Sequence, residues 1–296
     1  MKTVLSVVVA SMATIFSVTA GAKTYTDIPY TAQAAPTDLQ RLNLVVPDAQ
    51  ATATPLLVWI GGGAWAYVDR DKEMDMAERL SSAGIAVASV GHRLSPAVWR
   101  DPALDTGVQH PAHVEDVASA VAWLRDNAQT YGIDVDRIFI GGFSSGAHLA
   151  TLVASDATYL KGVGLTTDAI AGVVAIGGTY DIPDYHRAFA TGSRPELAVE
   201  HVEAVFGSDP ASMAAASPAA HIETFDRPLL LVSDRNTYGY TRLYEDALVE
   251  NERAAVTVVH ARNLGHGPLW LHLSNDDDSF LRDMIATFVL SGMPAE

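Results

Sequence analysis

The sequence contains no cysteine among its 296 residues. Disulfide bonds and thiolate chemistry are therefore excluded. Basic residues are also scarce, because 19 lysines and arginines stand against 35 acidic residues and give a formal net charge of −16. This charge argues against binding to nucleic acid and against docking on anionic lipid. After the N-terminal segment, no apolar run reaches the length that is needed to span a membrane.

Residues 1–22 have the pattern of a secretory signal peptide. Met1-Lys2 is a short basic start, Val4–Val18 is apolar, and Ala20-Gly21-Ala22 supplies small residues for cleavage. A buried first helix is the alternative, but the segment offers few polar positions for the exposed side of such a helix. Cleavage would leave a mature chain that begins at Lys23. We expect this chain to be soluble and either periplasmic or secreted.

Residues 23–296 are expected to form a single α/β domain, since 49% of the chain is hydrophobic and 18% is charged. Short apolar runs, typical of strands covered on both faces, alternate with helical patterns such as the apolar spacing in Val114–Leu124. This alternation predicts a mostly parallel central sheet with helices on both faces. The predicted strands are Leu42–Val46, Leu56–Ile60, Ile85–Val90, Ile138–Ile140, Gly172–Ile176, Leu229–Val232 and Val256–Val259.

Two further segments carry structural predictions. Residues 184–220 show no strand pattern, so they are predicted to form a helical excursion over the site. The last helix is predicted to begin at Ser274 or Asn275, with Asp276–Asp278 in its first turn. Acidic residues in that place suit the helix dipole, which explains the acidic run more simply than a calcium site does.

The most informative motif is Gly142-Phe143-Ser144-Ser145-Gly146. It follows a predicted strand and precedes a stretch of small residues with helical character, which is the setting of the nucleophile elbow in α/β-hydrolases. Only Ser144 has glycine two residues before and two residues after it, so Ser144 is the predicted nucleophile and Ser145 is not. A glycine-rich turn without catalysis is the alternative interpretation of so short a pattern.

A serine hydroxyl needs a base to take its proton, and the elbow fold carries its histidine late in the chain. His266 fits best, because it follows the last predicted strand and has glycine on both sides. His260 and His272 are weaker candidates nearby. Asp234 is the only carboxylate in the short loop after the strand Leu229–Val232, so it is the candidate acid. An aspartate that binds strand-end amides is the alternative.

An acyl-transfer site also needs preorganised donors for the developing oxyanion. The backbone N–H of Ser145, directly after the nucleophile, is one predicted donor. Gly62, Gly63 and Ala64 supply the others, because they follow the strand Leu56–Ile60 and leave their amides unobstructed. A phosphate-binding loop is disfavoured, because no Lys-Ser/Thr pair follows these glycines. No metal or organic cofactor is implied by the sequence.

These residues give the chain a resemblance to α/β-hydrolase carboxylesterases of the hormone-sensitive-lipase-like, feruloyl-esterase-like and arylformamidase-like group. The resemblance runs from about Leu42 to the C-terminus and covers an oxyanion motif, a Tyr-Arg-Leu-Ser-Pro segment, a helix before the elbow and a Ser-Pro element. The matching stretches are Trp59–Trp65, Gly91–Pro96, His110–Leu124 and Ser217-Pro218. The resemblance implies the α/β-hydrolase fold with a small helical cap, and hydrolysis of a carboxylic ester.

Three positions depart from the group's pattern. Gly61 stands in place of the motif histidine, which implies a looser oxyanion hole, and His92 stands in place of the usual tyrosine. The group's acid falls some nine residues after the proline that opens its strand, and this spacing points to Asn236 or Thr237 rather than Asp234. Either Asp234 acts from a shifted loop, or Asn236 orients the histidine and activity is reduced.

The sequence therefore predicts a serine carboxylesterase that hydrolyses a small-molecule ester through an acyl-enzyme intermediate. Ser144 is its nucleophile, His266 its base, and Asp234 or Asn236 orients the base. A binding protein of the same fold with impaired catalysis is the first alternative, and an arylformamidase-type amide hydrolase is the second. Trp65, Trp99, Phe143 and Trp270 are candidates for an aromatic substrate pocket, although large apolar side chains also build cores.

Overall fold

The computed structural model describes residues 21–32, 39–48, 52–253 and 255–292. The predicted signal peptide, residues 1–22, lies outside these ranges except for its last two residues. Within the described ranges, no helix combines the length and the apolar character that crossing a membrane requires.

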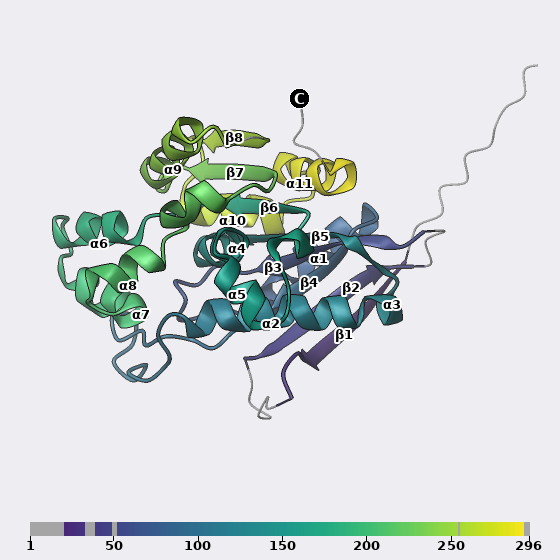
Figure 1. The fold of residues 1–296 in the computed structure, drawn as a ribbon, viewed down its shortest axis with the longest axis horizontal. Coiled ribbons are helices and arrows are strands. Elements are labelled where there is room, and N and C mark those ends of the chain that lie inside the picture. Colours follow the sequence, from purple (N-terminus) through teal and green to yellow (C-terminus); the bar gives the residue numbers. More distant parts are fainter. Residues whose placement is uncertain (1–20, 33–38, 49–51, 254, 293–296) are drawn as a thin grey trace, which may run out of the picture.

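A mostly parallel sheet forms the centre of the molecule, as the sequence predicted (Figure 1). In the described part of the chain the sheet has eight strands in the order β1-β2-β4-β3-β5-β6-β7-β8. The pairs β1/β2 and β2/β4 are antiparallel, and the remaining pairs are parallel. The strands are β1 (Ala22–Pro29), β2 (Arg41–Pro47), β3 (Thr54–Ile60), β4 (Ala86–Val90), β5 (Ile133–Phe143), β6 (Gly172–Ile176), β7 (Leu229–Asp234) and β8 (Val256–Ala261).

Helices cover both faces of this sheet. One face packs against α2 (Ala112–Asp126), α3 (Ala128–Tyr131), α4 (Ser145–Ser155), α5 (Ala157–Gly162) and α9 (Tyr238–Glu250). The other face packs against α1 (Met74–Ser82), α10 (His266–Ser274) and α11 (Phe280–Ser291). Two short 3-10 helices, η1 (Arg70–Glu73) and η2 (Thr167–Ala169), lie in connections.

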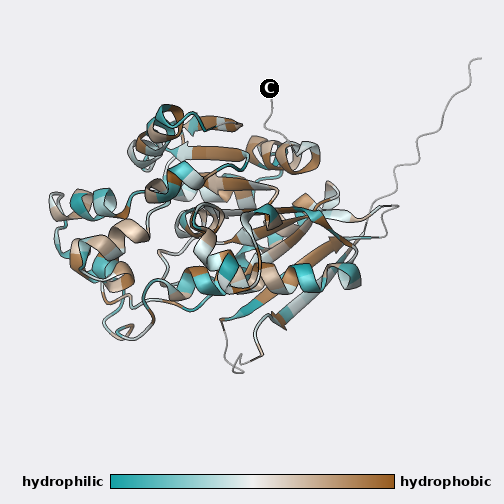
Figure 2. Ribbon diagram, in the orientation of Figure 1, coloured by the Kyte–Doolittle hydropathy of each residue, from teal (hydrophilic) through white to brown (hydrophobic). Residues whose placement is uncertain are grey.

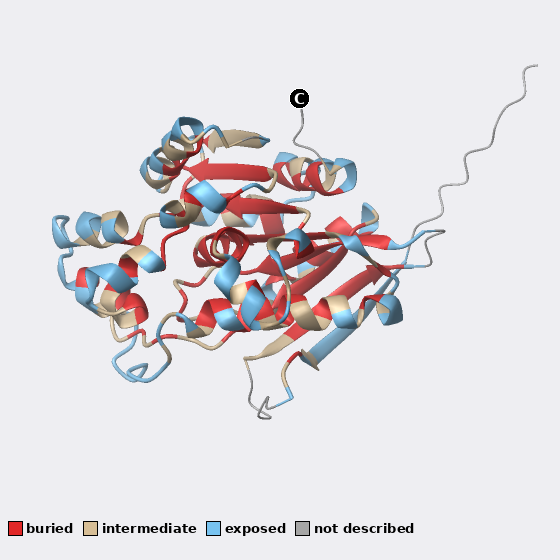
Figure 3. Cartoon of the chain, viewed as in Figure 1, coloured by how far each residue is buried: buried red, intermediate tan, exposed pale blue. Residues whose placement is uncertain are grey.

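The two layers of core follow from the alternation of side chains along each strand. In β3, Leu56, Val58 and Ile60 face the layer that contains α2 and α4. Leu57 and Trp59 face the layer that contains α1 and α11. All of them are buried, and both sides of the strand are apolar, which is why β3 is a continuous apolar run in the sequence. The central strands are mainly hydrophobic and buried (Figures 2 and 3), apart from residues 134–137 near the start of β5.

Residues 184–220 contain helices and no strand. These helices gather at one end of the molecule, beyond the ends of the strands (Figure 1). The first of these helices begins after Asp181, whose side chain caps it by accepting a hydrogen bond from the Asp184 backbone N–H at 2.9 Å. The elements are α6 (Ile182–Ala190), the π-helical turn η3 (Ala198–Glu203), α7 (Ala204–Phe206), α8 (Pro210–Ala215) and the 3-10 helix η4 (Pro218–Thr224).

The predicted start of the last helix is wrong. Ser274 ends α10, and α11 begins only at Phe280 behind the cap residue Ser279. Asp276–Asp278 therefore lie in the turn between the two helices and not in a first helical turn. The turn is held by the Arg282 guanidinium, which donates hydrogen bonds to the backbone carbonyls of Asp276 and Asp277. These contacts of a basic side chain with the preceding turn, which the hydrophobic pattern does not encode, accompany the later start of α11.

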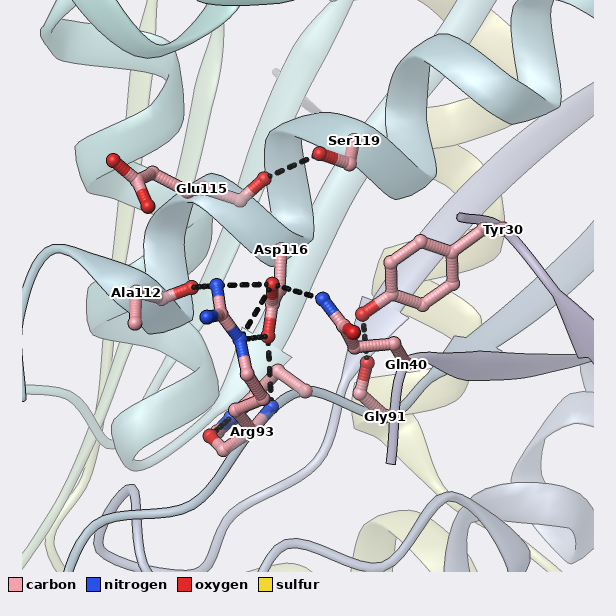
Figure 4. Close-up of polar contacts among 9 residues, drawn as sticks. Tyr30, Gln40, Gly91, Arg93, Ala112, Glu115, Asp116 and Ser119 are labelled. Carbon is pink, nitrogen blue, oxygen red and sulfur yellow. Dashed lines mark hydrogen bonds and ion pairs between the residues drawn. The ribbon is translucent and has the colours of Figure 1, made fainter. Parts of the chain in front are cut away.

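An ionic network around the buried Asp116 carboxylate fixes the loop after β4 against α2 (Figure 4). The Asp116 carboxylate accepts hydrogen bonds from the backbone N–H of Arg93 at 2.8 Å and from its guanidinium at 2.7 and 2.9 Å. Gln40 donates a further bond to the same carboxylate at 2.7 Å. A buried carboxylate is stable only when it is paired in this way. The segments Gly91–Pro96 and His110–Leu124 thus meet through Arg93 and Asp116.

Candidate active site

Ser144 lies in the tight turn between β5 and α4. Its backbone angles are φ 56° and ψ −120°, a strained conformation for a residue with a side chain. Strain of this kind costs about 1–3 kcal/mol and persists only where the surroundings impose it. Here the Ser144 N–H donates to the Ile176 carbonyl at 2.8 Å, and the Ser144 carbonyl accepts from His148 N–H at 3.2 Å. The turn is the elbow that the sequence motif predicted.

The two glycines of the motif are required by close approach of backbone. A Cβ atom on Gly142 would overlap the backbone of Gly146. A Cβ atom on Gly146 would overlap the carbonyl oxygen of Ile60 at the end of β3. The small residues at both positions therefore allow α4 to begin directly over the ends of two central strands. This placement presents the Ser144 hydroxyl at the edge of the sheet where the parallel strands end.

The structure brings Ser144, His266 and Asp234 together. The Ser144 hydroxyl donates to His266 Nε2 at 2.9 Å, and His266 Nδ1 donates to Asp234 Oδ2 at 2.6 Å. Asp234 is the last residue of β7, and His266 is the first residue of α10 rather than a loop residue. The His266 ring also stacks on Phe143, with ring centroids 4.6 Å apart.

The surroundings of Asp234 keep its carboxylate charged. Burial favours the neutral form and is the largest influence on its pKa, but the hydrogen bond from His266 and those from two backbone N–H groups outweigh it. The pKa of Asp234 therefore lies below its usual value. An ionised carboxylate only accepts hydrogen bonds, so Nδ1 of His266 carries the proton. In the neutral ring, Nε2 is then the acceptor that faces Ser144.

Asn236 lies beside this array but does not face the imidazole ring. Its side-chain oxygen accepts a hydrogen bond from the backbone N–H of His266 at 3.1 Å. Its own backbone N–H donates to Asp234 Oδ1 at 2.6 Å. The two other candidate histidines are held elsewhere, because His260 bonds to Ser233 and Glu245, and His272 bonds to Asp276.

The loop after β3 runs past Ser144 in an unusual conformation. Gly63, Ala64 and Trp65 have φ values of 154°, 51° and 58°, all in the range that side chains disfavour. The Gly63 carbonyl accepts two backbone hydrogen bonds at 2.9 Å, and the Trp65 carbonyl accepts one from Ser95 N–H at 2.9 Å. Within the described ranges, the backbone N–H groups of Gly62, Gly63, Ala64 and Ser145 have no acceptor. All four residues border the cavities at Ser144.

Two cavities meet at Ser144 and His266. The larger, of about 370 Å³, reaches under the helical excursion and is lined by the aromatic side chains Trp65, Tyr185, Phe189 and Tyr240. The smaller, of about 250 Å³, lies between the loop after β3 and α10 and is lined by Tyr67, Phe143 and Trp270, with Lys72 and Glu73. Of the four aromatic residues singled out in the sequence, Trp65, Phe143 and Trp270 therefore line these cavities. Trp99 instead contacts Tyr67 and His201.

Comparison with known proteins places the chain in a family. The model of the BD-FAE family matches residues 42–237, which is more than half of the chain. The chain belongs to the BD-FAE family. The match ends before His266, so it covers the elbow and the candidate acid but not the histidine.

Curated relatives of this BD-FAE protein carry hydrolase names. Esterase LipQ of Mycobacterium tuberculosis is 27% identical over 230 residues, covering 74% of this chain and 52% of the relative. The probable carboxylic ester hydrolase LipM of the same organism is 28% identical over 229 residues, covering 75% and 48%. Kynurenine formamidase of Salmo salar is 26% identical over 143 residues, covering 48% and 43%. The chain spans about half the length of these curated relatives.

Solved structures show the fold. Esterase B from Lactobacillus rhamnosis superimposes with a TM-score of 0.74 at 22% identity, covering 92% of this chain and 86% of the other. A truncated carbohydrate esterase from gut microbiota gives 0.72 at 22% identity, covering 93% and 97%. The predicted α/β-hydrolase fold of this BD-FAE protein is thus confirmed.

One charged side chain near the site was missed in the sequence. Glu73 is 2% exposed, and its carboxyl group borders the smaller cavity beside Gly61. It ends the polar stretch Asp69–Glu73, where neighbouring charges suggest an exposed turn, so no local signal marks it as buried. In the described part of the BD-FAE protein, no three His, Asp or Glu side chains are arranged to hold a metal ion.

Proposed function

We propose that this protein is a serine carboxylesterase that hydrolyses small carboxylic esters through an acyl-enzyme intermediate. The observation that carries the proposal is the continuous hydrogen-bonded array of Ser144, His266 and Asp234 in the strained elbow. Such an array supplies a nucleophile, a base and a charged partner for the imidazolium. The esterase names of the curated relatives support the same chemistry.

The geometry supports the following sequence of steps. Ser144 Oγ attacks the ester carbonyl carbon while its proton passes to His266 Nε2, and the carbonyl oxygen becomes the oxyanion. The tetrahedral intermediate then collapses, and the proton on Nε2 passes to the departing alkoxide oxygen, leaving the acyl group on Ser144. Water then gives a proton to Nε2 and attacks the acyl carbon. When the second tetrahedral intermediate collapses, the bond from Ser144 Oγ to the acyl carbon breaks, Oγ takes the proton back from Nε2, and the acid is released.

The oxyanion would be stabilised by the four backbone N–H groups that lack acceptors in the described structure. Ser145 is the first residue of α4, so its amide and the positive end of the helix dipole both favour negative charge there. Gly62, Gly63 and Ala64 supply amides from the opposite loop. In other hydrolases each such donor contributes about 3 kcal/mol to the transition state.

The two cavities accommodate the two halves of an ester. The smaller cavity is bordered by Gly267 and Trp270 on the helix of His266 and by Phe143, on which the imidazole stacks. An alkoxide oxygen leaving into it would lie next to Nε2, so we assign this cavity to the alcohol half. The larger cavity under α6, with its aromatic walls, is then assigned to the acyl half.

The two alternatives from the sequence have less support. A binding protein with impaired catalysis is disfavoured, because a carboxylate and not an amide faces Nδ1 of His266. Arylformamide hydrolysis would use the same array, and one curated relative is named kynurenine formamidase. Turnover of N-formylaniline alongside an aryl ester separates ester from formamide preference, and a higher kcat/KM for the formamide would overturn the esterase assignment.

The chemistry is tested by a covalent label. Purified protein is expected to turn over p-nitrophenyl acetate and to react once with a fluorophosphonate, since the activated hydroxyl attacks phosphorus as it attacks a carbonyl. Mass spectrometry of the digested adduct should place the label on Ser144. A label on any other serine, or none on a correctly folded protein, would contradict the proposal.

We also propose that the protein is exported. The support is the basic start, apolar stretch and small-residue site within residues 1–22. N-terminal sequencing of material from the periplasm or the medium is expected to give a chain that begins at Lys23. Exported material that still begins at Met1 would refute this prediction.

A further inference from the structure

The buried carboxyl group of Glu73 lies at the junction of two parts of the site. Its Oε2 accepts a hydrogen bond from the indole N–H of Trp59 at 2.9 Å, and its Oε1 accepts one from that of Trp270 at 3.3 Å. Only 2% of the residue is exposed. Burial raises the pKa of Glu73, and the two indole bonds lower it by less. Burying such a group costs free energy unless its hydrogen bonds compensate.

The two indoles belong to the elements that carry the catalytic parts. Trp59 is the next-to-last residue of β3, and the loop with Gly62, Gly63 and Ala64 follows directly. Trp270 lies one helical turn after His266 on α10. The carboxyl group thus ties the strand that leads into the oxyanion loop to the helix that begins with the catalytic histidine. Ser144 borders the same cavity as these two elements, and catalysis there requires both elements in their correct relative positions.

Gly61 makes room for this tie. A Cβ atom on Gly61 would lie 2.8 Å from Oε1 and 3.1 Å from the carboxyl carbon of Glu73. Any side chain at position 61 would therefore displace the carboxyl group from the two indoles. This is the position where the resembling esterases carry histidine, and in this chain the space beside the loop is filled by Glu73 instead. The glycine at position 61 and the buried glutamate are therefore two parts of one arrangement.

The nearby charges do not give Glu73 another role. The Lys72 ammonium lies 3.6 Å from the Asp69 carboxylate, and both are largely exposed. An ion pair so exposed contributes little. The Glu73 carboxyl group is bound by the two indoles alone among the described residues. A group held only by donors from two catalytic elements serves to position them.

We propose that Glu73 is a positioning residue that holds the oxyanion loop and the His266 helix at the separation that ester hydrolysis requires. The inference rests on the proposed serine esterase function. Glu73 acts through Trp59 and Trp270 and does not touch the reacting atoms. Its loss should misplace the oxyanion donors and Nε2 relative to each other, which harms the transition state more than it harms binding of the ester.

Two variants test the link that Glu73 makes between the two elements, one at the carboxyl group and one at the indole of Trp270. Glu73→Gln keeps the shape but turns an amide N–H₂ toward one indole N–H, and Trp270→Phe removes one donor and leaves the carboxyl group. Each is expected to lower kcat for p-nitrophenyl acetate about 10- to 100-fold, the effect of a small misplacement at a site. KM should stay nearly unchanged in Glu73→Gln, whereas Trp270→Phe also changes a wall of the alcohol cavity. Trp123→Phe, at a half-buried tryptophan of α2 that packs against Tyr131 and borders neither cavity at Ser144, is the matched control and should leave kcat unchanged.

A transition-state analogue gives an independent readout. An aryl trifluoromethyl ketone forms a hemiketal with the serine, and its oxyanion needs the same donors. Its affinity should fall in Glu73→Gln and Trp270→Phe by the same factor as kcat/KM. A rise in KM at constant kcat, or unchanged ketone affinity in folded variants, would overturn the positioning role. Circular dichroism melting of each variant shows whether it is folded.

A double variant tests the steric part. Gly61→Ala alone should lower kcat, because its methyl group displaces the carboxyl group. In the Glu73→Ala background the same methyl group has room, so it should cause no further loss. Additive losses would contradict the link between residues 61 and 73.

Wild-type protein without turnover or label would overturn the esterase function itself, whereas active wild type with unaffected variants overturns only the role of Glu73.

Discussion

Replacing Ser144 with alanine is expected to lower kcat for p-nitrophenyl acetate by a factor on the order of 10⁶, the effect of removing the nucleophile from a comparable array. The His266–Asp234 pair stays in place, but no hydroxyl remains for Nε2 to activate. Labelling by the fluorophosphonate should disappear completely. The strained backbone at position 144 tolerates alanine no worse than serine, so the melting temperature should stay close to that of the wild type.

Ser145→Ala is the matched comparison for this experiment. It removes the neighbouring hydroxyl, which has no hydrogen-bond partner within the described residues, and keeps the backbone N–H. This variant should retain most of the activity and all of the labelling. If labelling is lost in Ser145→Ala and survives in Ser144→Ala, then Ser145 and not Ser144 is the nucleophile.

The local patterns were sufficient to predict the fold, and they selected two candidate site residues that the structure places side by side. A tight strand-to-helix turn requires glycine at fixed offsets, so the sequence alone distinguishes Ser144 from Ser145. His266 has glycine neighbours in the segment after the last strand, and the structure places it within hydrogen-bonding distance of Ser144. Both predictions rest on contacts between elements that the parallel sheet necessarily brings to one edge.

Features that depend on specific side-chain contacts or on strand pairing could not be predicted from the local pattern. Strand β1 is exposed along nearly all of its length and lacks an apolar pattern, so only its pairing with β2 defines it. Glu73 follows several charged residues and gives no sign that Trp59 and Trp270 bury it. The Arg282 contacts that shift the start of α11 are formed with a turn that the sequence assigned to the helix itself.

The sequence could not decide between Asp234 and Asn236 as the residue that orients His266, and the reason is physical. The spacing from Pro228 pointed to Asn236, while charge pointed to Asp234, and only the lengths of β7 and its loop decide between them. The structure extends β7 to Asp234, whose backbone pairs with Ala261, so the carboxylate lies at the strand end and faces the imidazole. Asn236 then falls in the turn, where it binds the backbone of His266.

We expect Asp234→Asn to lower kcat by about 10⁴-fold, because the ring then lacks an acceptor that fixes its tautomer and a charge that stabilises the imidazolium. The amide should still accept the backbone N–H bonds that Asp234 receives in the turn, so the protein should remain folded. The measurement is kcat for p-nitrophenyl acetate across pH 5–9. A loss of kcat at every pH in this range indicates the lost charge, whereas recovery of kcat at one end of the range indicates a shifted pH optimum.

Asn236→Asp is the paired variant, and the two results together decide the acid. The new carboxylate can still accept the His266 backbone bond, but it adds a second negative charge beside Asp234. Repulsion raises the pKa of the buried acid, so we expect a loss of no more than about tenfold and mainly at low pH. A strong gain in kcat for Asn236→Asp, with a mild effect for Asp234→Asn, would show that the acid position belongs to residue 236. The hydrogen bond from Nδ1 to Asp234 at 2.6 Å predicts the opposite order.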